Sequence, residues 1–145
     1  MKLYILNGPN LNMLGIREPS HYGKTGYSEL CDMIKKHCTS LGIEAVLYQS
    51  NHEGELVDKI QEAYYEGADG IVINPGAYTH TSIALLDAVK SVQLPTVEVH
   101  ISKLEEREDF RQISYIRLAA VKTITGHGVA GYAEAIDFLF DYLKK

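Results

Sequence analysis

Cysteine is scarce in this sequence. The 145-residue chain has two cysteines, Cys31 and Cys38, and both fall in one stretch of helical periodicity. A separation of seven residues along a helix corresponds to roughly 10 Å between Cα atoms, which is too far for a disulfide bridge. The sequence therefore excludes a disulfide framework and predicts two reduced thiols.

Basic charge is also in short supply. Lysine and arginine number 14 against 19 aspartates and glutamates, so the formal net charge is −5. A nucleic-acid-binding surface needs a basic face or stripe, and neither the composition nor any local run offers one. We therefore expect no nucleic-acid partner, although a few arginine, histidine and backbone N–H groups could still bind a small anion.

Long apolar runs are absent as well. The opening segment MKLYILNGPN has too short an apolar run before Asn7, Gly8 and Pro9 to act as a signal peptide. No stretch approaches the length that spans a bilayer. We expect a cytoplasmic protein with no membrane partner.

The chain is instead rich in short apolar runs that alternate with segments of helical period. With 46% hydrophobic residues it can bury one core, and we expect a single domain over 1–145. The pattern predicts strands at 3–6, 44–49, 70–74, 95–101 and 119–125. It predicts helices at 28–41, 54–66 and 82–91, a charged helical turn or two at 104–112, and a closing helix at 132–145.

This alternation favours an α/β fold. We expect a doubly wound, five-stranded parallel sheet in a three-layer α/β/α sandwich, with the flavodoxin-like strand order 2-1-3-4-5 as the leading topology. In such a sheet ligands bind outside the carboxyl ends of the strands. Polar residues follow most of the predicted strands, in NGPNLN at 7–12, QSN at 49–51, NPG at 74–76 and EVHIS at 98–102. Taken singly, each could also serve a turn or a helix cap.

Glu98 and His100 lie two residues apart in the fourth predicted strand, so they share one face of it. A carboxylate can orient an imidazole and favour its protonated form, which is a general acid. The same pattern would equally fit a core histidine whose hydrogen bond to Glu98 is purely structural. Ser102, next on the same face, and the polar ends of the other strands favour a chemical role.

The segment 13–26 is long for a strand-to-helix connection, and we expect it to act as a mobile lid. Arg17 and Tyr22 could fold over the same site, where a guanidinium would stabilise a phenolate. The residue types alone also fit an alternative interpretation, a disordered surface loop in which Tyr22 packs on the rim. A second charged run at 105–111 is interpreted as mostly a solvated helix face, except that Arg111 could reach a carboxylate ligand.

Three further patterns are weak. The run GHGVAG at 126–131 fits G-x-G-x-x-G, but too little chain follows for a dinucleotide-binding unit, and a tight turn with close helix packing is the better interpretation. His80, Glu98 and His100 match no familiar zinc spacing. His80 and Ser82 lack a nucleophile elbow, and capping explains the hydroxyls of this segment.

Several ordered motifs together resemble the type II 3-dehydroquinate dehydratase family over almost the whole chain. They are NGPNLNMLGIREPSHYG at 7–23, QSNHEGEL at 49–56, INPGAYTHTSIALLDA at 73–88, VEVHIS at 97–102, REDFR at 107–111 with Ser114, and GHGVAGY at 126–132. The resemblance implies a lyase that converts 3-dehydroquinate to 3-dehydroshikimate without metal or cofactor. It also implies a homododecamer built as a tetramer of trimers.

The resemblance assigns roles to individual residues. Tyr22 is similar to the catalytic base of the family, with Arg17 beside it. His100 is similar to the acid that protonates the departing C1 hydroxyl, and Glu98 to the group that orients His100. Asn10 is similar to the residue that positions a water near the enolate oxygen. The positions expected to bind the substrate's hydroxyls and carboxylate are Asn74, His80, Asp87, Ile101, Ser102 and Arg111.

The chain departs from the family pattern at Lys103, near Lys59 and over 117–122. The last of these is expected to bear on assembly more than on chemistry. Two other classes of function stay open on the residues alone. One is a flavodoxin-like module that binds a nucleotide or small anion through the turn at 126–131, and the other is a metal-dependent hydrolase using His80, Glu98 and His100.

Overall fold

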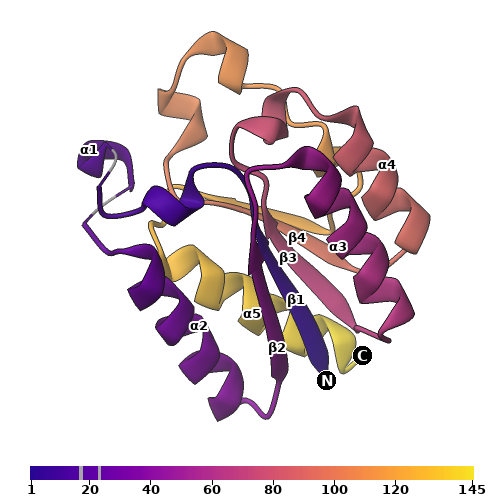
Figure 1. The fold of residues 1–145 in the computed structure, drawn as a ribbon. Helices are drawn as coiled ribbons and strands as arrows, with labels where there is room; N and C mark the ends of the chain where they lie inside the picture. Colours follow the sequence, from indigo (N-terminus) through magenta and orange to yellow (C-terminus); the bar gives the residue numbers. More distant parts are fainter. Residues whose placement is uncertain (17, 23) are drawn as a thin grey trace.

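The computed structural model describes residues 1–16, 18–22 and 24–145, and it contains one parallel sheet (Figure 1). The strands run in the order β2-β1-β3-β4-β5, as the sequence predicts. Their bounds are Lys2–Asn7 for β1, Glu44–Gln49 for β2, Gly70–Asn74 for β3, Thr96–His100 for β4 and Lys122–Thr125 for β5.

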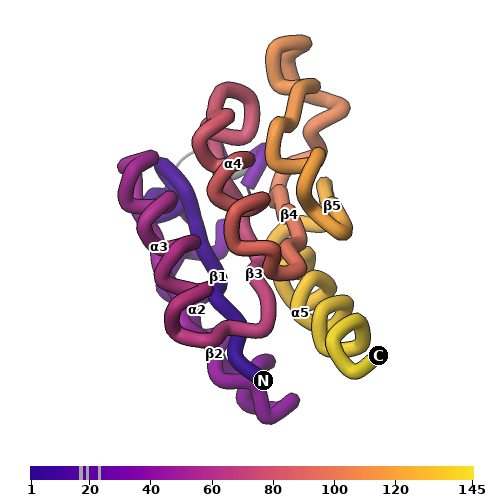
Figure 2. The backbone as a smooth tube through the Cα atoms, turned by 90° about the vertical axis from the view of Figure 1, so that its right-hand side faces the viewer, coloured from indigo at the N-terminus to yellow at the C-terminus, as the bar shows by residue number. Residues whose placement is uncertain are grey.

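The longer helices cover both faces of this sheet, and they are α2 (Tyr27–Ser40), α3 (Glu53–Tyr65), α4 (Ile83–Val92) and α5 (Ala130–Leu143). The short helix α1 (Pro19–Tyr22) stands apart from the sheet (Figure 1). Short 3-10 turns lie at η1 (Leu11–Met13), η2 (Gly76–His80), η3 (Leu104–Glu106), η4 (Asp109–Arg111) and η5 (Ile116–Leu118). In Figure 1, α3 and α4 lie to the right of the strands and α2 to the left, while Figure 2 shows α3 and α4 side by side. The predicted three-layer sandwich is confirmed.

Alternation along β1 explains the two layers of core. Leu3 and Ile5 are fully buried against α2 and α5, in a cluster that includes Ile34 and Ile136. Their neighbours in sequence, Tyr4 and Leu6, point to the opposite face and pack with α3 and α4 through residues such as Leu56, Ile60, Leu85 and Val89. Side chains of a strand alternate between faces, so this apolar strand supplies both cores.

The register brings the polar strand ends to one edge of the sheet. Asn7 at the end of β1 pairs with Gln49 of β2 and with Asn74 of β3. At the other side of the sheet His100 pairs with Thr125. The residues that follow these strands therefore gather where a doubly wound sheet binds its ligands.

Two loops at this edge approach each other closely because glycine allows it. The N–H of Gly8 donates to the carbonyl of Asn74 at 2.8 Å. A Cβ at Gly8 would lie 2.3 Å from the carbonyl oxygen of Pro75, and one at Gly76, whose φ is +60°, would lie 2.9 Å from that of Pro9. Neither position has room for a larger residue, so the glycines fix how the loops after β1 and β3 meet.

The charged helical turn or two expected at 104–112 are two separate 3-10 turns, η3 and η4. The expected lid at 13–26 contains the short helix α1, while Arg17 and Gly23 lie outside the described residues. Within the described part of the chain, no helix has the length and apolar character needed to cross a membrane.

Candidate functional site

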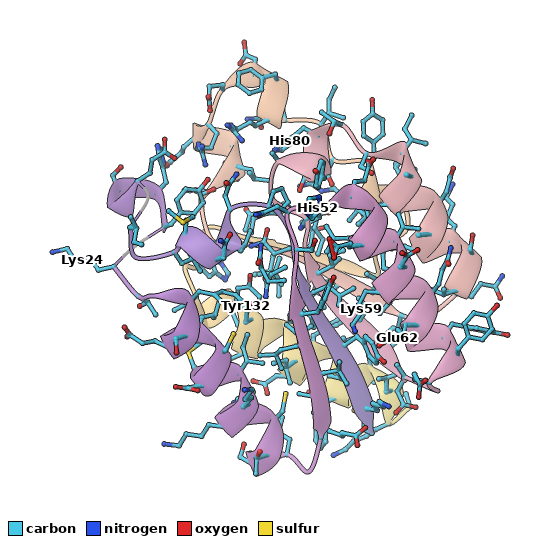
Figure 3. The ribbon with its side chains drawn as sticks, viewed as in Figure 1. Lys24, His52, Lys59, Glu62, His80 and Tyr132 are labelled. Atoms are coloured by element: carbon cyan, nitrogen blue, oxygen red, sulfur yellow. The ribbon has the colours of Figure 1, made fainter. Side chains whose placement is uncertain are left out.

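A small cavity of about 150 Å³ opens at the carboxyl edge of the sheet. It is lined by most of the residues that the sequence singled out: Asn10, Tyr22, Asn74, His80, His100, Ile101, Ser102 and Arg111. The remaining lining residues are Leu11, Gly76, Ala77, Leu104 and Arg107. Figure 3 labels His80 at this end of the molecule. The tertiary structure thus collects side chains from five separate stretches of the chain.

Asn10 is held by the ends of β1 and β2. Its backbone has φ of +70°, a left-handed conformation that asparagine tolerates better than most residues. Its N–H donates to Oδ1 of Asn51 at 3.0 Å, and that oxygen also accepts from the amide of Gln49 at 3.1 Å. The same Gln49 amide donates to the carbonyl of Gly8 at 3.1 Å. The polar end of β2 therefore positions Asn10 at the cavity wall.

Glu98 and His100 form a buried pair, as their spacing predicts. The Nε2 of His100 hydrogen-bonds Oε2 of Glu98, and the Glu98 side chain is fully buried. The hydroxyl of Ser114 donates to both carboxylate oxygens, at 2.9 and 3.0 Å. Burial acts to raise the pKa of the Glu98 carboxyl, but the bond and charge of His100, with the bond from Ser114, outweigh it and hold that pKa below its ordinary value. The imidazole thus rests against an ionised carboxylate that fixes its ring.

Arg107 is the main residue that the sequence interpretation placed wrongly. The run at 105–111 was expected to be mostly a solvated face, yet the Arg107 side chain is only 6% exposed. Its Nη1 donates to the hydroxyl of Tyr22 at 3.2 Å and to Oγ of Ser102 at 3.1 Å. Its position within the REDFR motif was the one available signal, because the charge run alone does not distinguish Arg107 from its exposed neighbours.

The charge of Arg107 is stabilised where it lies. Burial acts to lower the pKa of this guanidinium, but the hydrogen bond and charge of Tyr22, together with the charge of Glu108, outweigh burial and hold the pKa above its ordinary value. The guanidinium carbon also lies 5.6 Å from the centre of the Tyr22 ring. A permanent cation therefore adjoins the Tyr22 phenol in the cavity wall.

His80 and Arg111 form the outer part of the cavity. The Nδ1 of His80 donates to the carbonyl oxygen of Ile113 at 2.7 Å, and burial lowers the pKa of its imidazole. The Nε of Arg111 donates to Oε1 of Glu108 at 2.9 Å, and its side chain is 22% exposed. Arg111 therefore offers a partly solvated guanidinium to an anion, as the sequence suggested.

Asn74 is held by a buried tyrosine that the sequence interpretation did not single out. The Asn74 amide nitrogen donates to the hydroxyl of Tyr132 at 3.0 Å, and its Oδ1 accepts from the N–H of Gly76 at 3.1 Å. Tyr132, fully buried in the core and labelled in Figure 3, in turn donates to Oδ1 of Asn7 at 2.5 Å. This chain of bonds orients the Asn74 amide beside the cavity.

One expected site residue does not join the others in the cavity. Asp87 is exposed on α4 and does not line the cavity of the described chain. Arg17 lies outside the described residues, so its predicted place beside Tyr22 is not described. Glu98 contributes from behind His100 and does not itself line the cavity wall.

The weak sequence patterns have structural explanations. Gly126 and Gly128 have φ of +79° and +61°. The N–H of Gly126 donates to the carbonyl of Ser102 at 3.1 Å, and the N–H of Gly128 donates to the carbonyl of Ile101 at 3.1 Å. A Cβ at Gly131 would lie 3.4 Å from Ile124, which confirms the predicted close packing of α5. The turn at 126–131 therefore supports the cavity wall after β4.

The other two patterns are equally plain. Ser82 is the N-cap of α4 and accepts from the N–H of Leu85 at 3.0 Å, so it precedes the helix and is not within its first turn. Among the described residues, no group of three or more His, Cys, Asp or Glu side chains is arranged to hold a metal ion. The trio of His80, Glu98 and His100 is accordingly not such a group. Cys31 and Cys38 are unpaired, as predicted.

The assembled groups suit acid–base chemistry on a small polar anion. A phenol beside a guanidinium can act as a base, and an imidazole held by a carboxylate can act as an acid. Both line one cavity with amide, hydroxyl and guanidinium groups that can bind oxygens of a substrate.

Comparison with known proteins agrees with this geometry. The family model described as Dehydroquinase class II matches residues 1–140. A 3-dehydroquinate dehydratase of Clostridium acetobutylicum is 50% identical over 145 residues, which cover 100% of both chains. One from Caldicellulosiruptor saccharolyticus is 49% identical over 142 residues, 98% of each chain. The crystal structure of a type II dehydroquinase from Butyrivibrio crossotus superposes with a TM-score of 0.95 at 55% identity, covering 96% of this chain and 97% of that one. This chain therefore belongs to the class II dehydroquinase family.

Proposed function

We propose that this chain is a hydro-lyase that converts 3-dehydroquinate to 3-dehydroshikimate, a step of the shikimate pathway. The observation that carries the proposal is the placement of Tyr22, Arg107 and His100 around one cavity, with Glu98 hydrogen-bonded behind His100, in a chain of this family. The family's curated relatives are named for this activity.

The reaction starts with loss of a proton alpha to the ketone. The Tyr22 phenolate takes that proton, and the charge of Arg107, 3.2 Å from the hydroxyl, stabilises the phenolate. The electron pair moves onto the ketone oxygen and forms an enolate. Asn10 positions a water that donates to this oxygen, since developing negative charge needs a donor already in place. Arg17 is proposed to act with Arg107 on the phenolate.

The second half of the reaction expels the C1 hydroxyl. The enolate electrons return to form the carbon–carbon double bond, the carbon–oxygen bond at C1 breaks, and His100 supplies a proton so that water leaves. Glu98 holds the imidazole ring and favours its protonated form. Protons balance, because the base gains one and the acid loses one.

The remaining polar residues bind the substrate. Arg111 pairs with the carboxylate, as its partly exposed guanidinium allows. Ring hydroxyls and the carboxylate are bound by the side chains and backbone N–H groups of Asn74, His80, Ile101 and Ser102. The small volume of the cavity, about 150 Å³, suits a single-ring substrate.

We further propose that the chain assembles into a homododecamer, a tetramer of trimers. Large apolar side chains on the surface support assembly, including Ile83 at 55% exposure and Leu118 at 73%. Asp87 is also exposed on α4, so it would bind substrate only in the cavity of a second copy. Size-exclusion chromatography with light scattering tests the assembly, and a monomer with full activity would contradict it.

The other organisational proposals are that 1–145 forms one catalytic domain, that the segment at 13–26 closes over the substrate as a lid, and that the protein works in the cytoplasm. Tyr22, in the wall of the cavity, supports a closing role for that segment. The unpaired Cys31 and Cys38 are consistent with a reducing compartment.

The test is the rise in ultraviolet absorbance from the conjugated enone when purified protein meets 3-dehydroquinate in buffer containing EDTA. We expect rapid product formation that EDTA does not reduce. Folded protein that forms no enone at any pH would overturn the proposal and direct attention to nucleotide binding at the turn over 126–131.

A further inference from the structure

The carboxylate of Glu98 has a second cation near it. Besides His100 and Ser114, the hydroxyl of Thr123 on β5 lies 3.4 Å from Oε1, and Nη2 of Arg117 lies 3.8 Å from Oε2. Arg117 belongs to η5, and its own side chain is 47% exposed, whereas that of Glu98 is fully buried. A positive charge at the protein surface therefore reaches the innermost acidic group of the site.

Arg117 approaches from the side of β5, the edge strand of the sheet. It lines a surface cleft together with Thr123 and Thr125 of that strand. It falls in 117–122, where the chain departs from the family pattern. Beside the expected bearing of this segment on assembly, Arg117 adjoins the residue that orients the proposed acid.

The charge of this buried group changes during the proposed reaction. Once His100 has given its proton to the leaving hydroxyl, Glu98 faces a neutral imidazole. A buried carboxylate without a cation is costly and tends to take up a proton. Protonated Glu98 would no longer hold the imidazole as an acceptor or draw a proton back to it. The guanidinium of Arg117 keeps its charge at every working pH, so it can oppose this protonation.

We propose that Arg117 is a positioning residue whose fixed charge keeps Glu98 ionised while His100 loses and regains its proton. This inference rests on the proposed function. The cation also repels the proton that the Glu98–His100 pair shares, so the pair releases it more readily to the leaving hydroxyl. Burial acts to raise the pKa of Glu98, whereas the neighbouring hydrogen-bond donors and charges act to lower it. Arg117 is one of the groups that lower this pKa.

Other charged groups surround the pair and must be held constant. His80 on η2 interacts electrostatically with both His100 and Glu98, and Arg111 on η4 interacts with His80. Glu105 on η3 interacts electrostatically with Arg117. The variants below leave these groups in place, so a difference between them reports on Arg117.

The experiment compares Arg117→Gln, which removes the charge, with Arg117→Lys, which keeps it. Lys36→Gln, on the exposed surface of α2, is the matched control for loss of one positive charge. We expect Arg117→Gln to lower kcat by about 3- to 10-fold and to move the alkaline limb of kcat upward by roughly half a pH unit, a modest effect because the guanidinium is partly solvated. Arg117→Lys should regain most of the rate, and Lys36→Gln should match the unmodified protein.

A second readout does not depend on turnover. Titration of the His100 ring by NMR should show a higher midpoint in Arg117→Gln than in the unmodified protein or the Lys36→Gln control. Unchanged kcat, pH profile and His100 titration in Arg117→Gln would overturn the inference. Equal impairment of Arg117→Gln and Arg117→Lys, with loss of the oligomer, would also overturn it in favour of an assembly role. An unmodified protein with no dehydratase activity would instead overturn the proposed function, and the NMR midpoint would still decide the electrostatic claim.

Discussion

The guanidinium of Arg107 donates a hydrogen bond to the hydroxyl of Tyr22, with Nη1 and Oη 3.2 Å apart, although 85 positions separate the two residues in sequence. The same nitrogen donates to Ser102 at 3.1 Å, so the guanidinium ties the α1 segment to the end of β4. A nearly buried cation thus adjoins the phenol proposed as the base.

Replacing Tyr22 with Phe should nearly abolish dehydration. The change removes the group that accepts the substrate proton while keeping the ring, and general bases contribute about 100- to 10,000-fold to rates. Enone absorbance measures the loss. Thermal unfolding of the same variant should be close to that of the unmodified protein, and substantial retained turnover would rule out Tyr22 as the base.

Replacing Arg107 with Gln should lower the rate by about 10- to 100-fold, the range expected when a hydrogen bond to a charged group is lost. The rise of kcat/KM with pH should move to higher pH, because the phenolate loses its stabilising charge. Arg107→Lys keeps the charge and should retain more activity than Gln. A kcat/KM profile of Arg107→Gln that coincides with that of the unmodified protein would contradict this role.

Replacing Glu98 with Gln should destabilise the protein most near neutral pH. The pKa of Glu98 in the folded protein lies below its ordinary value of 4.5. The ionised carboxylate therefore stabilises the fold above the ordinary pKa, and this stabilisation is lost as the pH falls through the lower pKa of the folded protein. Urea unfolding from pH 7 to pH 3 should show a gap between the two proteins that closes in acid. Glu44→Gln, at an exposed ion pair with Lys2, is the control and should change little at any pH. A gap that widens in acid would show that Glu98 is protonated in the folded protein.

Removing the hydroxyl of Tyr132 with Phe should cost about 1–3 kcal/mol of unfolding free energy, since buried amide groups of Asn7 and Asn74 lose their partner. The freed Asn74 amide should also raise KM for 3-dehydroquinate. Tyr65, whose side chain is 82% exposed, gives the matched control Tyr65→Phe with little expected effect. Equal stability of the two variants would mean that the buried bonds contribute nothing net.

Adding a methyl group at Gly8 should disrupt the contact between the loops after β1 and β3. The Cβ of Gly8→Ala would lie 2.3 Å from the Pro75 carbonyl oxygen, so the loops after β1 and β3 must separate. We expect a loss of roughly 2–4 kcal/mol, measured by urea unfolding, together with loss of activity. Gly54→Ala is the control, because its Cβ meets nothing within 4 Å and helix α3 should gain up to about 1 kcal/mol. Wild-type stability in Gly8→Ala would show that the close approach is not required.

The sequence by itself determined the order and type of the main elements. Strand and helix periodicities are local, and in β1 the apolar residues Leu3 to Leu6 supply both faces of the sheet, so the run alone indicates a buried strand. The polar residues after each strand, including Asn10 and Asn74, could be assigned to one edge because parallel strands share their carboxyl ends.

Only the tertiary structure decided which charges and hydroxyls serve that edge. Arg107 and Glu108 look alike in a charged run, yet one side chain is 6% exposed and the other 51%. The bonds of Tyr132 to Asn7 and Asn74, and the approach of Arg117 to Glu98, join residues from elements that are distant in the chain. Burial and long-range pairing depend on how whole elements pack, and no local pattern of residue types carries that information.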